Sequence, residues 1–319
     1  MRVFVAGGSG VIGRSLIPQL VSAGHQVAAT TRFQAKTEML LSLGARPVVL
    51  DALDAGAVKA AVRVFAPDVL MNQLTSLPPR YEVRKLEPWY RRTAKLRVDG
   101  TNHLLAAARE VGAKRFIYQS IAFMYAPVGP AVVDETAPLM VDAPEPFSLS
   151  VGPTVEGERL TQSARGIEGV VLRYGQLYGP GTYFSARGDL VRQARRWMLP
   201  IVGAGQGTFS FVHVDDAASA AVCAVDRGHG IYNIVDDDPA LMRDWIPAFC
   251  AEVGAPRPMR IPVWLAVLLA GRMAAFFEDA RGASNAKAKR ELGWTPSHPS
   301  WREGFLTPSP VTGSDLRTI

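Results

Sequence analysis

The 319-residue sequence predicts an α/β fold, a doubly wound parallel sheet with a smaller C-terminal lobe. Short apolar runs alternate with helical patterns from Arg2 to Gly175, as in a parallel sheet whose strands are buried on both faces. Beyond Gly175 the alternation gives way to Gly- and Pro-rich loops and several helices. Right-handed crossovers make such a sheet doubly wound, and we expect the lobe over the carboxyl ends of the strands, where such sheets bind ligands.

The predicted elements follow one another along the chain, identified from β-rich runs and helical periodicity. The predicted strands are 2–8, 25–31, 46–51, 67–73, 114–120, 169–175 and 230–235. The predicted helices are 11–20, 35–44, 55–65, 94–112 and 156–166, the last after a Pro-rich loop. We expect residues 1–175 and 210–236 to form the sheet domain, and residues 176–209 and 237–319 to form the lobe.

The composition favours a packed globular protein, with 48% hydrophobic residues. The net charge of +6 is spread along the chain, so we expect no nucleic-acid partner. The apolar run 263–277 contains Arg272 and is too short to span a bilayer, which favours an amphipathic lobe helix and no membrane partner. Cys223 and Cys250 form no metal or disulfide framework, and the first strand leaves no room for a signal peptide. We therefore expect a cytoplasmic protein without a metal site.

A glycine pattern between the first strand and the first helix predicts a dinucleotide site. Gly7, Gly10 and Gly13 are spaced three apart, and Gly8 completes a second spacing of the same class. One glycine permits the tight turn, another lets the backbone approach pyrophosphate, and a third lets helix and strand pack closely. Unpaired N–H groups at the helix N-terminus would face the phosphates. The expected contacts of this turn are Gly7, Ser9, Gly10, Val11, Ile12 and Gly13.

The end of the second strand favours NADP(H) over NAD(H). The strand ends Thr30-Thr31-Arg32, with Lys36 one helical turn later and no carboxylate to grip a ribose 2′-hydroxyl. A guanidinium can clamp a 2′-phosphate through two hydrogen bonds. We expect Thr31, Arg32 and Lys36 to contact the cofactor, with an exposed surface role as the alternative for Arg32.

Beyond these features the sequence resembles an atypical branch of the extended short-chain dehydrogenases/reductases, which include NAD-dependent epimerases and dehydratases. Matching segments include "AGGSGVIG", "DGTNHLLAAAREVGAKRFIYQS", "LRYGQLYGPG" and "FVHVDDAASA". The resemblance implies a Rossmann sheet and places Asp51 and Ala52 at the adenine, and Gln73, Leu74 and Thr75 along the ribose and nicotinamide. It also implies that homodimers can form through the long helices. For Asp51, an acid at a helix N-terminus is the alternative.

The proton relay of the family is missing from the matching positions. Counting back from Glu158 places Ser150 where the family has its tyrosine and Thr154 where it has its lysine. The asparagine of the family becomes Arg97, and the position of the upstream catalytic serine falls on Ile121, next to Ser120. A positioned acid is worth roughly two to four powers of ten in rate, so its loss restricts the chemistry.

The sequence therefore supports three hypotheses. The first is an NADPH-dependent reductase of a conjugated or aromatic ketone, quinone or enone, in which the substrate or another side chain supplies the proton. The second is a redox-inert NADP(H)-binding regulator, and the third is a non-redox cyclase or isomerase. Substitute acids would be Ser120, Tyr125 or Tyr178, and the substrate would be a small molecule. The expected substrate contacts are Ser120, Tyr125, Ser150, Gln176, Tyr178 and Arg187.

Overall fold

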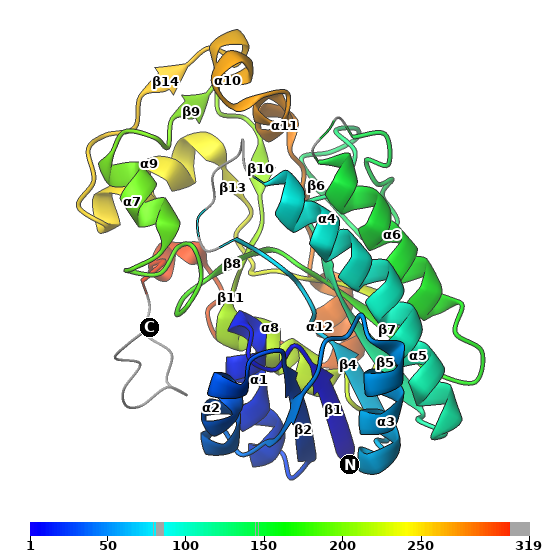
Figure 1. The fold of residues 1–319 in the computed structure, drawn as a ribbon. Helices are drawn as coiled ribbons and strands as arrows, with labels where there is room; N and C mark the ends of the chain where they lie inside the picture. Colours follow the sequence, from blue (N-terminus) through cyan, green and yellow to red (C-terminus); the bar gives the residue numbers. More distant parts are fainter. Residues whose placement is uncertain (79, 81–85, 144, 146, 307–319) are drawn as a thin grey trace.

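The computed structural model describes residues 1–78, 80, 86–143, 145 and 147–306. Its centre is a seven-stranded parallel sheet in the order β12-β7-β5-β4-β1-β2-β3 (Figure 1). The strands are β1 (Arg2–Ala6), β2 (Gln26–Thr31), β3 (Arg46–Val49), β4 (Val69–Asn72), β5 (Arg115–Ile121), β7 (Glu168–Tyr174) and β12 (Gly230–Ile234). The predicted doubly wound sheet is confirmed.

The two faces of the sheet are buried by alternating residues of each strand, since side chains alternate along a strand. In β1, Val3 and Val5 face one cluster of buried side chains, while Phe4 and Ala6 face the other. The first face is covered by α1 (Val11–Ser22), α2 (Thr37–Ser42), α8 (Val214–Cys223) and α12 (Ala286–Leu292). The second is covered by α3 (Ala55–Phe65), α5 (Thr101–Glu110) and α6 (Ser148–Gln162).

Two helices begin earlier than the sequence predicted. The predicted helix 94–112 belongs to a continuous helical run of α4 (Glu87–Lys95), a π-helical turn over Leu96–Gly100, and α5. Helix α6 starts at Ser148 and includes Gly152 and Pro153, which in the sequence indicated a loop. Tertiary packing overrides this local preference, because α6 buries Val151 and Thr154.

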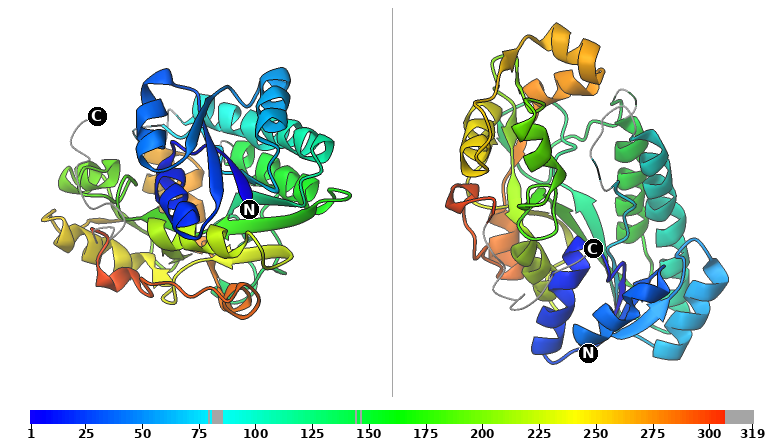
Figure 2. Two further views of the ribbon diagram at one scale, coloured as in Figure 1. Left: turned by 90° about the horizontal axis from the view of Figure 1, so that it is seen from below. Right: turned by 60° about the vertical axis from the view of Figure 1, so that its left-hand side comes forward.

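The smaller lobe lies beyond the carboxyl ends of the strands (Figures 1 and 2). Its helices are α7 (Asp189–Arg195), α9 (Met242–Glu252), α10 (Val263–Ala270), α11 (Met273–Asp279) and a 3-10 turn over Trp301–Glu303. A core rich in aromatic side chains holds it together, in which Phe184, Phe211 and Phe305 contact one another. It also contains the strand pairs β9 (Ile201–Val202) with β14 (Arg260–Ile261) and β10 (Thr208–Phe209) with β13 (Ala240–Leu241).

Short parallel strands join the lobe to the sheet domain. Strand β8 (Gln176–Tyr178) pairs with β11 (Phe211–His213), and β6 (Val132–Val133) pairs with β15 (Gly282–Ala283). Farther along the chain, Leu292 and Trp294 pack in the core of the sheet domain. The proposed boundaries of the two parts stay a prediction.

The apolar run 263–277 forms two helices, α10 and α11, rather than the single helix expected. The break falls at Gly271, which adopts a φ of 80°. Within the described residues, no helix combines the length and hydrophobicity needed to cross a membrane. Cys250 is buried and Cys223 half-buried, and both are free thiols.

Candidate cofactor and substrate site

The glycine turn after β1 has the close packing that a dinucleotide cradle needs. Gly7 has a φ of 92°, and a Cβ there would lie 2.7 Å from the Gln73 carbonyl oxygen. A Cβ on Gly13 would collide with the backbone of Gly8, so helix α1 can pack here only on glycine. Gly10 is exposed and is the N-cap of α1, with no side chain capping the free amides. These features fit a bound pyrophosphate.

The basic residues after β2 lie at the surface, where a 2′-phosphate could reach them. The charged groups of Arg32 and Lys36 each lie 5.4 Å from the centre of the Phe33 ring. Arg32 is exposed, Lys36 is half-buried and Thr31 is buried. Neither cation forms an ion pair with a described residue, so both charges are free to meet a ligand.

Asp51 lies near Arg32 and is already hydrogen-bonded. Arg92 donates to its Oδ2 at 2.8 Å, and the Leu53 amide donates to its Oδ1 at 3.1 Å. Although burial opposes the shift, these hydrogen bonds and the charge of Arg32 hold the pKa of Asp51 below its usual value. The N-cap of α3 is Asp54, which accepts from the Ala57 amide, so Asp51 is not the capping acid. Its adenine contact stays a prediction, as does that of the buried neighbour Ala52.

The residues after β4 border the glycine turn. The Gln73 amide donates to the Ala6 carbonyl at 2.9 Å, which holds the end of β4 against the turn. The buried Gln73 carboxamide lies beside the Tyr174 hydroxyl without a hydrogen bond of good geometry. Leu74 and Thr75 are half-buried at the same edge. This placement agrees with the expected position along the nicotinamide ribose, which stays a prediction.

Two of the candidate acids lie in one buried polar network. Ser120 donates to Glu158 Oε1 at 2.5 Å, and Arg173 donates to both oxygens of Glu158 at 2.8 and 2.7 Å. Arg173 also donates to the Tyr125 hydroxyl at 3.0 Å, and that hydroxyl donates to Asn233 Oδ1 at 2.7 Å. Burial raises the pKa of Tyr125, against the opposing charge of Arg173. The protons of Ser120 and Tyr125 are thus engaged by protein acceptors.

The positions of the absent relay lie around the π-helical turn and α6. Thr154 is fully buried and donates to the Ser150 carbonyl at 2.6 Å, while Ser150 is half-buried. Arg97 is buried, and its Nη1 makes long contacts of 3.3 Å to the Tyr118 hydroxyl and 3.4 Å to the Gln119 carbonyl. Among the described residues at these positions, the cation beside the phenol of Tyr118 is the guanidinium of Arg97, and no lysine ammonium is paired with a tyrosine.

The third candidate acid, Tyr178, lies in the packed core of the lobe. Its ring packs edge-on against His213 and Phe305, and its hydroxyl is buried without a hydrogen-bond partner among the described residues. Burial, reinforced by nearby carboxylates, raises its pKa above the usual tyrosine value. Gln176 is half-buried on β8, and exposed Arg187 borders a pocket at α7 together with other arginines. This environment favours a packing role for Tyr178.

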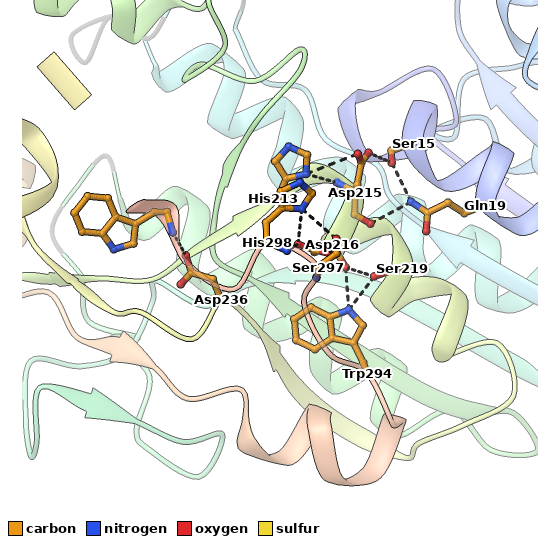
Figure 3. A network of polar contacts seen from close by, with 11 residues as sticks. Ser15, Gln19, His213, Asp215, Asp216, Ser219, Asp236, Trp294, Ser297 and His298 are labelled. Atoms are coloured by element: carbon orange, nitrogen blue, oxygen red, sulfur yellow. Dashed lines mark hydrogen bonds and ion pairs between the residues drawn. The ribbon is translucent and has the colours of Figure 1, made fainter. Parts of the chain in front are cut away.

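A second polar cluster, absent from the sequence predictions, joins α8 to the C-terminal segment (Figure 3). Asp216 accepts four hydrogen bonds, two each from Ser297 and His298, at 2.6 to 3.0 Å. Asp215 accepts from Ser15 of α1, and His213 is the side-chain N-cap of α8. Because residues 297 and 298 lie about eighty residues from Asp216 in the chain, no local pattern could have indicated the pairing.

The same cluster brings together potential metal ligands, His213, Asp216 and His298, within 4.8 Å. The two imidazole rings are stacked with centres 3.8 Å apart, so their in-plane lone pairs do not converge on one ion. Both oxygens of Asp216 are occupied by hydrogen bonds. We interpret this cluster as a structural tie between lobe and sheet domain, and call it the Asp216 tie.

A family model described as the NAD dependent epimerase/dehydratase family matches residues 3–235. A 3-diazoavenalumate denitrifying reductase of Streptomyces sp is 44% identical over 314 residues, covering 96% of this chain and 99% of that protein. A 4-hydroxy-2-methyl-3-oxo-4-farnesyl-3,4-dihydroquinoline-1-oxide ketoreductase of Stigmatella aurantiaca is 28% identical, covering 92% of each chain. The crystal structure of UDP-glucose 4-epimerase from Thermotoga maritima with UDP-glucose is similar, with a TM-score of 0.74, 22% identity and 96% of each chain covered.

Proposed function

The chain belongs to the NAD dependent epimerase/dehydratase family, and we propose that it is an NADPH-dependent reductase of an aromatic or conjugated acceptor. The first substrate class is an aromatic diazo compound, and the second is a conjugated carbonyl compound. One observation carries the proposal: α6 has Ser150 and Thr154 where the resemblance requires the proton-donating tyrosine and its lysine. The reaction should therefore be one that needs no proton from the enzyme.

The residues around the glycine turn support the cofactor part of the proposal. The free amides at the start of α1 suit a pyrophosphate, and Arg32 with Lys36 suits a 2′-phosphate. When bound, the reduced nicotinamide supplies a hydride. The chain itself would bind and orient this group against the end of β4, where Gln73 and Thr75 lie.

The chemistry of a diazo substrate fits a site without an acid. Hydride addition to a ketone leaves an alkoxide, which must be protonated or stabilised as it forms. Hydride addition to the diazonium-bearing carbon forms a C–H bond, while the C–N bond breaks and its electron pair leaves with N2. An arenediazonium ion and a hydride give an arene and N2, so charge and electrons balance without a proton.

The side chains near β5 also favour a reaction that needs no proton from the enzyme. Ser120 donates its proton to Glu158, and Tyr125 donates to Asn233, so a substrate would have to displace a short buried hydrogen bond to use either one. The relative that is 44% identical is named as a denitrifying reductase of a diazo compound. Its name and the missing relay support the same class of substrate.

A conjugated ketone remains the second candidate, because a relative that is 28% identical is named a ketoreductase. A quinone or an enone delocalises the negative charge that the hydride brings, and a phenol on the substrate could supply the proton. Under this alternative the enzyme would again act without a Tyr–Lys pair.

The proposal is tested with a hydroxyaryl diazonium carboxylate, doubly labelled with 15N, and NADPH deuterated at either the 4R or the 4S position. We expect release of labelled N2 and deuterium at the former diazo carbon from only one of the two cofactors. A reaction without enzyme is the control, since spontaneous reduction would use both deuterated cofactors. Turnover of quinones or polycyclic ketones alone would favour the second candidate. Tight NADPH binding with no turnover of any acceptor would contradict the reductase proposal.

A further inference from the structure

Arg14 lies directly after the glycine turn and is not part of the predicted cofactor contacts. It is the fourth residue of α1, and its amide donates to the Gly10 carbonyl at 3.1 Å. Its side chain reaches to the loop after β8. A Cβ on Gly181 would lie only 2.5 Å from Nη2 of Arg14, so the guanidinium is in close contact with that loop.

Within the described part of the chain, the charge of Arg14 meets no counterion. The described residues provide it with neither an ion pair nor a side-chain hydrogen bond, although it is partly buried. The first turn of α1 contains no acidic residue, and a cation in that turn is opposed by the positive end of the helix dipole. Burial also lowers the pKa of the guanidinium. A cation kept in such a place indicates an anionic ligand.

The position of Arg14 identifies the anion. On one side lies the turn of Gly7 to Gly13, whose free amides suit a pyrophosphate, and on the other lies the Gly179–Gly181 loop. The 2′-phosphate contacts, Arg32 and Lys36, follow a different strand, β2. We propose that Arg14 binds the pyrophosphate of the dinucleotide, as a charged partner to the glycine turn. This inference rests on the proposed nicotinamide cofactor.

The test measures equilibrium binding and does not depend on turnover. Arg14→Gln should raise the Kd of NADPH and of NADH by the same factor, about 10- to 100-fold, as expected when a charged hydrogen bond is lost. The variant should leave the Kd of 2′-AMP unchanged, because that fragment has a 2′-phosphate but no pyrophosphate. Arg32→Gln is the matched variant, and it should weaken NADPH and 2′-AMP while leaving NADH unchanged.

Circular dichroism and thermal unfolding establish that each variant is folded. Arg14→Met, which keeps the aliphatic stem, provides a second test if Arg14→Gln is unstable. Unchanged affinity for both cofactors in a folded variant would overturn the proposal, and so would a loss confined to NADPH and 2′-AMP. Since both cofactors are measured without an acceptor, the result is independent of whether the diazo reaction occurs.

Discussion

Glu158 is the residue on which the buried network around β5 depends. It accepts from Ser120 and binds Arg173 through both oxygens, and the side chains of this ion pair are only 3% and 5% exposed. Glu158→Gln leaves the guanidinium without its counterion, so we predict a loss of about 3–5 kcal/mol in the free energy of unfolding. Urea unfolding measures it. Glu156→Gln on the same helix breaks an exposed pair with Arg159 and should change stability by less than about 0.5 kcal/mol. Equal effects in the two variants would contradict the argument.

Arg32 governs the predicted preference for NADPH. Its guanidinium is exposed beside Phe33 and contributes to the low pKa of Asp51. We predict that Arg32→Gln raises the Kd of NADPH about tenfold and leaves the Kd of NADH within about twofold, because only the 2′-phosphate is lost as a partner. Fluorescence titration measures both constants. Arg63→Gln, on the exposed surface of α3, is the control and should change neither. A parallel loss for both cofactors would rule out the assignment.

Site residues differ in how far the sequence could predict them. The glycine turn and Arg32 could be predicted because strand, turn and helix follow one another within a few residues. The proposed phosphate contacts therefore leave a local signal in the sequence. The partners of the candidate acids are not local: Tyr125 donates to Asn233, which is 108 residues away. Arg14 was not predicted from the sequence, because its proposed role depends on its contact with the loop that contains Gly181. Only the fold brings that loop next to Arg14.

Among the elements, the strands of the sheet were predicted best. Strands buried on both faces are continuous apolar runs, which leave a clear local signal. Helix α6 was harder because Pro153 and Gly152 indicate a loop. Tertiary packing stabilises its first turns, in which Val151 lies in a buried cluster with Leu86 and Tyr90. The two- and three-residue strands of the lobe carry too few residues for any periodicity, and none of them was predicted.

Helix α8 gives a prediction of pH dependence through the Asp216 tie. The hydrogen bond to Asp216 raises the pKa of His298, with the charges of Asp215 and Glu303 adding to it and burial opposing it. A group whose pKa is raised on folding stabilises the protein at pH values below the pKa that the group has in the unfolded chain, about 6.5 for histidine. This stabilisation is lost as the pH rises through the pKa of the group in the folded protein. We predict that the difference in unfolding free energy between the native protein and His298→Gln is larger at about pH 6 than at about pH 9. Denaturant titrations at both values measure it. A His298→Gln difference independent of pH would contradict the prediction.

At the scale of the whole molecule, lobe and sheet domain are joined by contacts between distant parts of the chain. Strands β8 and β11 pair, the Asp216 tie holds the C-terminal segment on α8, and the buried Asp236 accepts from the Trp301 amide at 3.0 Å (Figure 3). Burial raises the pKa of Asp236 to about 8. We infer that these joints hold the lobe in place on the sheet domain.

Asp216→Asn tests that inference, because the amide nitrogen cannot accept the hydrogen bonds that one carboxylate oxygen takes. The loss of two buried hydrogen bonds should weaken the joint by about 1–3 kcal/mol. Hydrogen exchange should then accelerate roughly 10- to 100-fold in α9 and in residues 297–303, while β1 and β4 keep their protection. Asp226→Asn, at an exposed acid in the short segment after α8, is the control and should leave all of these amides unchanged. If β1 and β4 lost protection by the same factor as α9, the molecule would unfold as one unit. The Asp216 tie would then stabilise the whole fold rather than the position of the lobe over the proposed cofactor site.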